Sequence, residues 1–132
     1  MTPKVTLILI SCIGLLFSSA FFLAPEFITL EQFPNAEGKG LKDLVTLRYA
    51  VASLIACIVV ITFQLRNIDG INRQRSIMLG YAIGFSIVFA TNLTLHLNSM
   101  ISAIPPTIGT GIVVILSLYS VFNLKVKDAN ED

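Results

Sequence analysis

Charged residues are scarce in this sequence. Only 13% of its 132 residues are Asp, Glu, Lys or Arg, whereas a soluble domain carries about 25%. Hydrophobic residues make up 55% and the mean hydropathy is +0.82, so the chain has too little polar surface to cover itself in water. We therefore expect a lipid bilayer to be its solvent. The net charge of +1 also argues against a nucleic-acid partner, which needs a strongly basic surface.

No polar stretch is long enough to form a separate soluble domain. Apolar runs of about 20 residues, the length that crosses a bilayer as a helix, fill most of the chain instead. The expected spans are residues 5–24, 44–65, 76–97 and 105–124. We expect Asp43 to be the N-cap of the second span, and residues 26–33 to form a short helix at the membrane interface. The predicted fold class is all-α, one integral membrane four-helix bundle over residues 1–132.

Lys and Arg residues are unevenly divided between the two ends of these spans. With four spans, one end of the bundle holds both termini and six of these residues, whereas the opposite end holds three. The six are Lys4, Arg66, Arg73, Arg75, Lys125 and Lys127, and the three are Lys39, Lys42 and Arg48. Because cytoplasmic loops are enriched in Lys and Arg, we expect a bacterial inner-membrane protein with both termini in the cytoplasm.

Charge is also missing from the cores of the spans, which contain no Asp, Glu, Lys or Arg. Intramembrane charges mark ion pathways and proton relays, so their absence argues against a proton-coupled transporter. One histidine cannot bind a haem from both sides, and no His/Cys cluster supplies a metal site. No catalytic residue, metal or cofactor is therefore predicted, and a membrane-embedded enzyme is the class we place last.

The chain has two cysteines, Cys12 and Cys57, at similar depths in the first and second spans. They do not form a Cys-x-x-Cys motif, and the cytoplasmic half of a membrane is not oxidising. We expect them to be small packing residues; whether they touch each other stays open.

The third span starts apolar and ends in polar residues. At 100° per residue, two polar stripes run along it. One contains Gly80, Gly84, Thr91, Thr94 and Asn98, and the other contains Asn92, His96 and Ser99. Glycines four residues apart allow a second helix to approach closely. We therefore expect Gly80 and Gly84 to pack against a helix and the third span to be central in the bundle. Other helix faces that carry small residues are expected to support a homo- or hetero-oligomer.

Five polar residues are expected to meet at the outer end of the bundle. They are Glu26, Arg48, Asn92, His96 and Asn98. Such a group could bind the polar head of an amphipathic ligand, with Glu26 orienting Arg48 and the neutral residues donating hydrogen bonds. The alternative interpretation is that Arg48 snorkels to lipid phosphates while the others satisfy loop backbone groups.

Three features of the first half of the chain carry a family likeness: Gly14 within the first span, Leu23-Ala24-Pro25-Glu26 after it, and Leu47-Arg48 at the start of the second. In these the chain resembles small bacterial four-span membrane proteins of unknown function that are distantly similar to DoxX-like proteins. The resemblance implies a four-helix bundle and no established chemistry. The first functional prediction is a non-enzymatic accessory subunit or structural component of a membrane assembly. The alternative is a binder or carrier of a lipid-like molecule, such as a quinone, an isoprenoid or a phospholipid.

Overall fold

The computed structural model describes residues 2–98 and 104–128, and within them it contains helices and no strand. The helices are α1 (Pro3–Leu23), α2 (Pro25–Gln32), α3 (Gly38–Leu65), α4 (Ile71–Leu97) and α5 (Pro105–Asp128). By length and composition, α1, α3, α4 and most of α5 are suited to cross a membrane. The predicted all-α membrane bundle is confirmed.

Two helices begin earlier than the apolar pattern predicted. α3 starts at Gly38 and α4 at Ile71, each more than a turn before the apolar run. Asp43 therefore lies inside α3 and is not its N-cap; Glu37 occupies that position without a side-chain hydrogen bond. The start points coincide with Gly38 and Gly70, whose φ angles of +56° and +95° are conformations that glycine adopts without strain.

Pro25 separates α1 from the short helix α2. The residue before a proline is disfavoured in the helical region, and Ala24 accordingly leaves it, with φ −136° and ψ 52°. Pro25 then starts α2, where its missing N–H costs no hydrogen bond. The expected short helix is therefore present, and it packs against α3 and α1.

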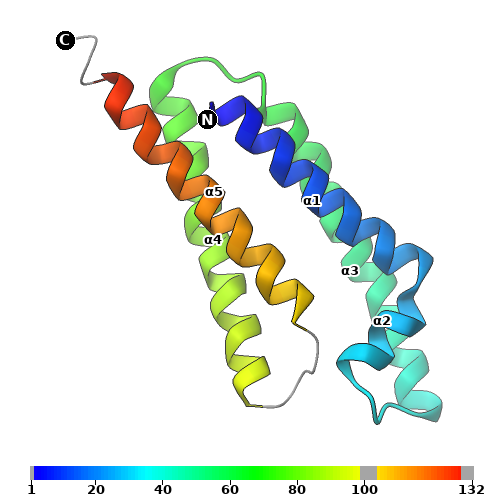
Figure 1. The fold of residues 1–132 in the computed structure, drawn as a ribbon. Coiled ribbons are helices and arrows are strands. Elements are labelled where there is room, and N and C mark those ends of the chain that lie inside the picture. Colours follow the sequence, from blue (N-terminus) through cyan, green and yellow to red (C-terminus); the bar gives the residue numbers. More distant parts are fainter. Residues whose placement is uncertain (1, 99–103, 129–132) are drawn as a thin grey trace.

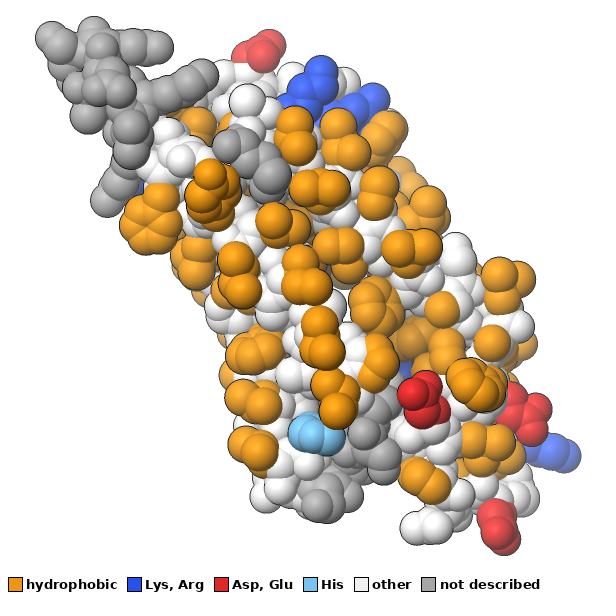
Figure 2. All heavy atoms as spheres, in the orientation of Figure 1, with side chains coloured by type: hydrophobic (Ala, Val, Ile, Leu, Met, Phe, Trp, Pro, Cys, Tyr) orange, Lys and Arg blue, Asp and Glu red, His pale blue; other side chains and the backbone are white. Residues whose placement is uncertain are grey.

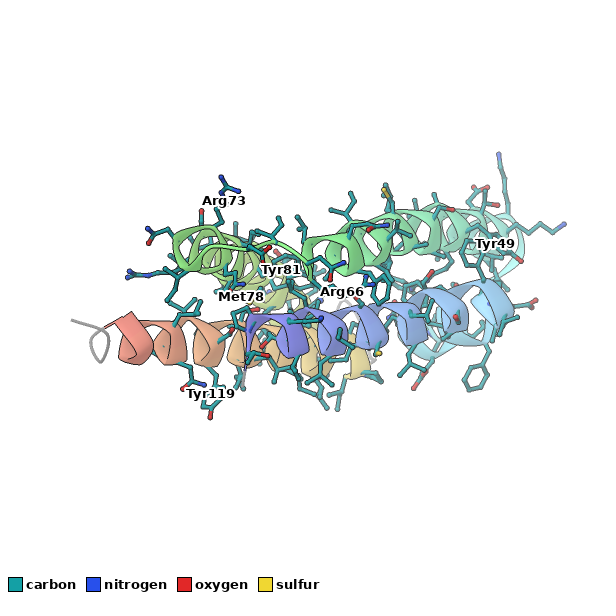
Figure 3. All side chains as sticks on the ribbon, turned by 90° about the horizontal axis from the view of Figure 1, so that it is seen from above. Tyr49, Arg66, Arg73, Met78, Tyr81 and Tyr119 are labelled. Atoms are coloured by element: carbon teal, nitrogen blue, oxygen red, sulfur yellow. The ribbon has the colours of Figure 1, made fainter. Side chains whose placement is uncertain are left out.

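The long helices form two pairs, α1 with α3 and α4 with α5 (Figure 1). The pairs meet mainly through α1 and α5, whereas α3 and α4 do not pack along each other although only a short turn joins them. Seen from above, α3 and α4 lie in one layer and α1 and α5 in the other (Figure 3). The third span, α4, is thus not central as predicted, because its extensive packing is with α5 and its contacts with the other helices are few.

The best-packed part of the bundle is the end that holds the start of α1, which we call the terminal end. Leu7, Met78 and Val121 are buried together there, one each from α1, α4 and α5. Elsewhere the surface is strongly apolar: Figure 2 shows hydrophobic side chains along the whole length, with charged side chains gathered toward the ends. That distribution suits contact with lipid tails between two polar headgroup layers.

Small residues hold α1 against α3. A Cβ atom at Gly14 would lie 2.6 Å from Cγ2 of Val59, so only glycine allows this approach. One turn further along, the Ser18 hydroxyl donates a hydrogen bond of 2.9 Å to the backbone carbonyl of Ala52. Ala52 and Ser18 are both buried, and together these contacts fix the spacing of the first pair.

Candidate functional site

A cleft of about 900 Å³ lies between the two helix pairs. All four long helices contribute to its walls, and most lining side chains are hydrocarbon. Phe17 from α1, Ile55 from α3, Phe85 and Val88 from α4 and Val113 from α5 are examples. The cleft exists because α3 and α4 do not close on each other, so their facing sides remain uncovered.

Gly80 and Gly84 line this cleft and do not pack against another helix. A Cβ atom at either position would meet no atom within 4 Å. The close approach predicted for them is therefore absent within the described chain, and the close contacts occur at other glycines. A Cβ at Gly109 would lie 2.6 Å from the ring of Phe17, and one at Gly111 would lie 3.2 Å from the ring of Phe89. On α4, the missing side chains widen the cleft.

Arg48 enters the cleft at the end where α2 lies, which we call the α2 end. Its Nε donates to Thr29 Oγ1 at 3.4 Å, and its Nη2 donates to Gln32 Oε1. The guanidinium also lies over the ring of Phe21, 5.1 Å from the centroid. α2 thus supplies both acceptors, and the packing of α2 on α3 determines the direction of the arginine.

The five predicted site residues do not all meet. Arg48 and Asn92 line the same cleft, from α3 and α4 respectively. Glu26 is exposed on α2 and is not among the hydrogen-bonding partners of Arg48, so Thr29 and Gln32 take the role expected of it. His96 is half-buried and does not line the cleft, and its Nδ1 is buried without a partner among the described residues.

Asn98 and the threonines of the first polar stripe bond within their own helix. Asn98 Nδ2 donates to the carbonyl of Thr94 at 2.9 Å, at the end of α4. The hydroxyls of Thr91 and Thr94 each donate to the carbonyl four residues earlier, at 2.9 and 2.8 Å. These groups are exposed and already satisfied, so they need no neighbouring helix. Ser99 of the second stripe lies outside the described residues.

A hydrogen bond between Thr62 of α3 and Tyr81 of α4 crosses the cleft toward the terminal end. The Thr62 hydroxyl donates to the carbonyl of Ile58 at 2.6 Å, so Tyr81 O–H is the donor to Thr62. The Tyr81 ring stacks on Phe85, with centroids 5.9 Å apart. Sequence reasoning missed this pair, because Thr62 lies near the end of α3 whereas Tyr81 lies well inside α4.

Cysteines and acidic residues are dispersed. Cys12 and Cys57 are free and exposed, so the packing role expected of them is not seen; α1 and α3 pack through Gly14 and Ser18 instead. Over residues 2–98 and 104–128, no three His, Cys, Asp or Glu side chains gather where they could hold a metal ion.

Comparison of the chain with protein-family models, curated proteins and solved structures gave no match. Function is therefore inferred from the geometry of the chain itself.

Proposed function

We propose that this integral membrane protein binds an amphipathic, lipid-like molecule in the cleft between its helix pairs. One observation carries the proposal: the cleft is apolar along its length and has Arg48 and Asn92 at its α2 end. The apolar walls would take a hydrocarbon tail, while the polar end would take the head. The volume of about 900 Å³ lies within the roughly 300–1,000 Å³ of small-molecule sites.

The shape of the cleft favours a flexible chain over a transmembrane helix as its occupant. The Thr62–Tyr81 hydrogen bond joins α3 to α4 across the cleft, so a straight helix could not pass along its full length. A quinone, an isoprenoid or a phospholipid tail can bend around that bridge.

An accessory or structural role in a membrane assembly is the second candidate. Gly80 and Gly84 are exposed and face open space on α4, which is where a Gly-x-x-x-Gly face could receive a helix of another chain. The proposed location is the bacterial inner membrane with cytoplasmic termini, on the strength of the Lys and Arg distribution. A distant relationship to DoxX-like proteins is also a proposal, and it implies no ligand or reaction for either candidate function.

Filling the cleft tests the proposed function. A Cβ atom at Gly80 or Gly84 meets no atom within 4 Å, and both positions line the cleft, so we expect the Gly80→Leu/Gly84→Leu variant to fold and to occupy part of the cleft. Ala50→Leu is the matched control, because Ala50 is exposed on α3 and does not line the cleft. Native mass spectrometry in mild detergent should find one amphipathic molecule per chain in the original protein and in the control. The double variant should lose most of it at unchanged elution volume.

Two results would decide against lipid binding. If the original protein retains no small molecule from membranes rich in lipid and quinone, the proposed function is wrong. If a second protein chain is retained in fixed ratio instead, and the Gly80→Leu/Gly84→Leu variant releases it, the accessory role replaces lipid binding.

A further inference from the structure

We infer that the cleft selects a lipid whose phosphate head carries a net negative charge, and that Arg48 is the residue that selects it. The inference rests on the proposed function and adds the chemical class of the ligand. It depends on three observations about Arg48: the hydrogen-bond donors it has left, the charge that remains on it, and the contacts that hold it.

Not all hydrogen-bond donors of Arg48 are used within the described residues. A guanidinium carries five N–H groups, and in this chain one from Nε and one from Nη2 are used, by Thr29 and Gln32. The remaining three have no partner among the described residues, and no nitrogen of Arg48 is buried without a partner. Two neighbouring N–H groups of a guanidinium match two oxygens of one phosphate, so the free edge can bind such a head in a bidentate manner.

The charge of Arg48 is not neutralised by an acid. Both of its hydrogen-bond acceptors, the Thr29 hydroxyl and the Gln32 amide, are neutral, and no ion pair to Arg48 is present within the described residues. Glu26 is exposed and faces elsewhere on α2. An arginine bordered by hydrocarbon and by lipid keeps an unfavourable solvation energy unless an anion approaches. An anionic head therefore gains an electrostatic attraction in this cleft that a zwitterionic or neutral head does not.

The guanidinium is held in place before any ligand arrives. The Thr29 hydroxyl donates to the carbonyl of Pro25 at 2.7 Å, which leaves its oxygen lone pair for Arg48 Nε. Phe21 covers one face of the group and Gln32 fixes one Nη. A snorkelling arginine would instead extend freely to the headgroups. Since the guanidinium is already oriented, binding a phosphate costs little side-chain entropy.

Competition between two lipids tests the inference. Delipidated protein is mixed with phosphatidylglycerol and phosphatidylcholine of identical acyl chains, and the bound ratio is read by native mass spectrometry. We expect a preference for phosphatidylglycerol of at least about tenfold, equivalent to about 1.4 kcal/mol, in the original protein. Lys42→Gln is the control, because Lys42 is an exposed cation on α3 outside the cleft, and this variant should keep the preference.

Two substitutions at Arg48 then separate charge from geometry. Arg48→Gln removes both the charge and the bidentate donors, so it should bind the two lipids equally and each more weakly than the original protein does. Arg48→Lys keeps the charge but lacks the bidentate donors, so it should keep the preference and bind both lipids more weakly, because both carry a phosphate. It also keeps the test decisive if the glutamine variant does not fold, as judged by circular dichroism and elution volume.

The possible results are distinguishable. Equal binding of the two lipids to the original protein overturns the inference and leaves the proposed function standing. A preference that survives in Arg48→Gln, or lipid affinities that are unchanged in Arg48→Lys, overturns the role of Arg48. Failure of the original protein to bind either lipid overturns the proposed function itself.

Discussion

Replacing Gly14 by alanine should separate α1 from α3. The added Cβ would lie 2.6 Å from Cγ2 of Val59, well inside the contact distance of about 3.5–4.0 Å between carbon atoms. Valine is β-branched and has one strongly preferred χ1 rotamer in a helix, so the methyl group cannot turn away. The two helix backbones must therefore move apart, which would also strain the hydrogen bond from Ser18 to Ala52.

Two opposing effects determine the size of the change. Overpacking a close contact costs about 1–3 kcal/mol. Alanine gains up to about 1 kcal/mol over glycine from helix propensity. At Gly80 and Gly84 only the second effect operates, because nothing lies within 4 Å of the added Cβ. Gly14→Ala should therefore be about 1–3 kcal/mol less stable than Gly80→Ala or Gly84→Ala, although the chemical change is identical.

The three alanine variants can be compared by heating each in detergent and measuring the folded fraction by size-exclusion chromatography. The apparent Tm of Gly14→Ala should fall below that of the original protein, whereas those of the two controls should be equal or higher. Equal melting of all three variants would refute the close contact between α1 and α3. A larger loss at Gly80 than at Gly14 would instead support helix packing at Gly80, as the sequence pattern first indicated.

Two further predictions concern the bridge over the cleft and the orientation of the chain. Tyr81→Phe removes the hydrogen bond to Thr62 but keeps the ring stack, and should lower stability in the same assay by about 0.6 kcal/mol, the average for interhelical hydrogen bonds in membranes. Tyr119→Phe is the control, because Tyr119 is exposed and points away from the bundle (Figure 3). An equal effect of both changes would contradict the Thr62–Tyr81 hydrogen bond. A phosphatase reporter should be active when inserted at Gly38 and inactive after residue 132; activity at the C-terminus would contradict the proposed orientation.

Much of the fold could be predicted because it depends on local features. Apolar runs of sufficient length predict spanning helices, whatever their neighbours. Pro25 ends α1 and Pro105 starts α5 through backbone sterics that act on adjacent residues only. The predicted starts of α3 and α4 were less accurate, because polar residues can extend a helix beyond its apolar run, as residues 38–43 do in α3.

The arrangement of the helices could not be predicted in the same way. The polar end of α4 suggested burial on several sides, yet Thr91 and Thr94 satisfy their hydroxyls with carbonyls of their own helix. Sequence does not distinguish a threonine bonded to its own helix from one bonded to a neighbour. The glycines of α4 were ambiguous for a similar reason, since a missing side chain either admits a helix or leaves a cavity. The packing of the other helices decides which occurs.

The partners of Arg48 show how the rotation of one short helix determines the chemistry of the cleft. Pro25, Thr29 and Gln32 are the buried residues of α2, and at 100° per residue Glu26 projects roughly 90° away from the centre of that face. The prediction of Glu26 as the partner followed charge complementarity and did not include this rotation. The difference has a chemical consequence. A carboxylate beside Arg48 would have neutralised it and occupied its donors, whereas a hydroxyl and an amide orient the guanidinium and leave its charge in place. An anion that binds Arg48 therefore has no acidic side chain of the described residues to displace.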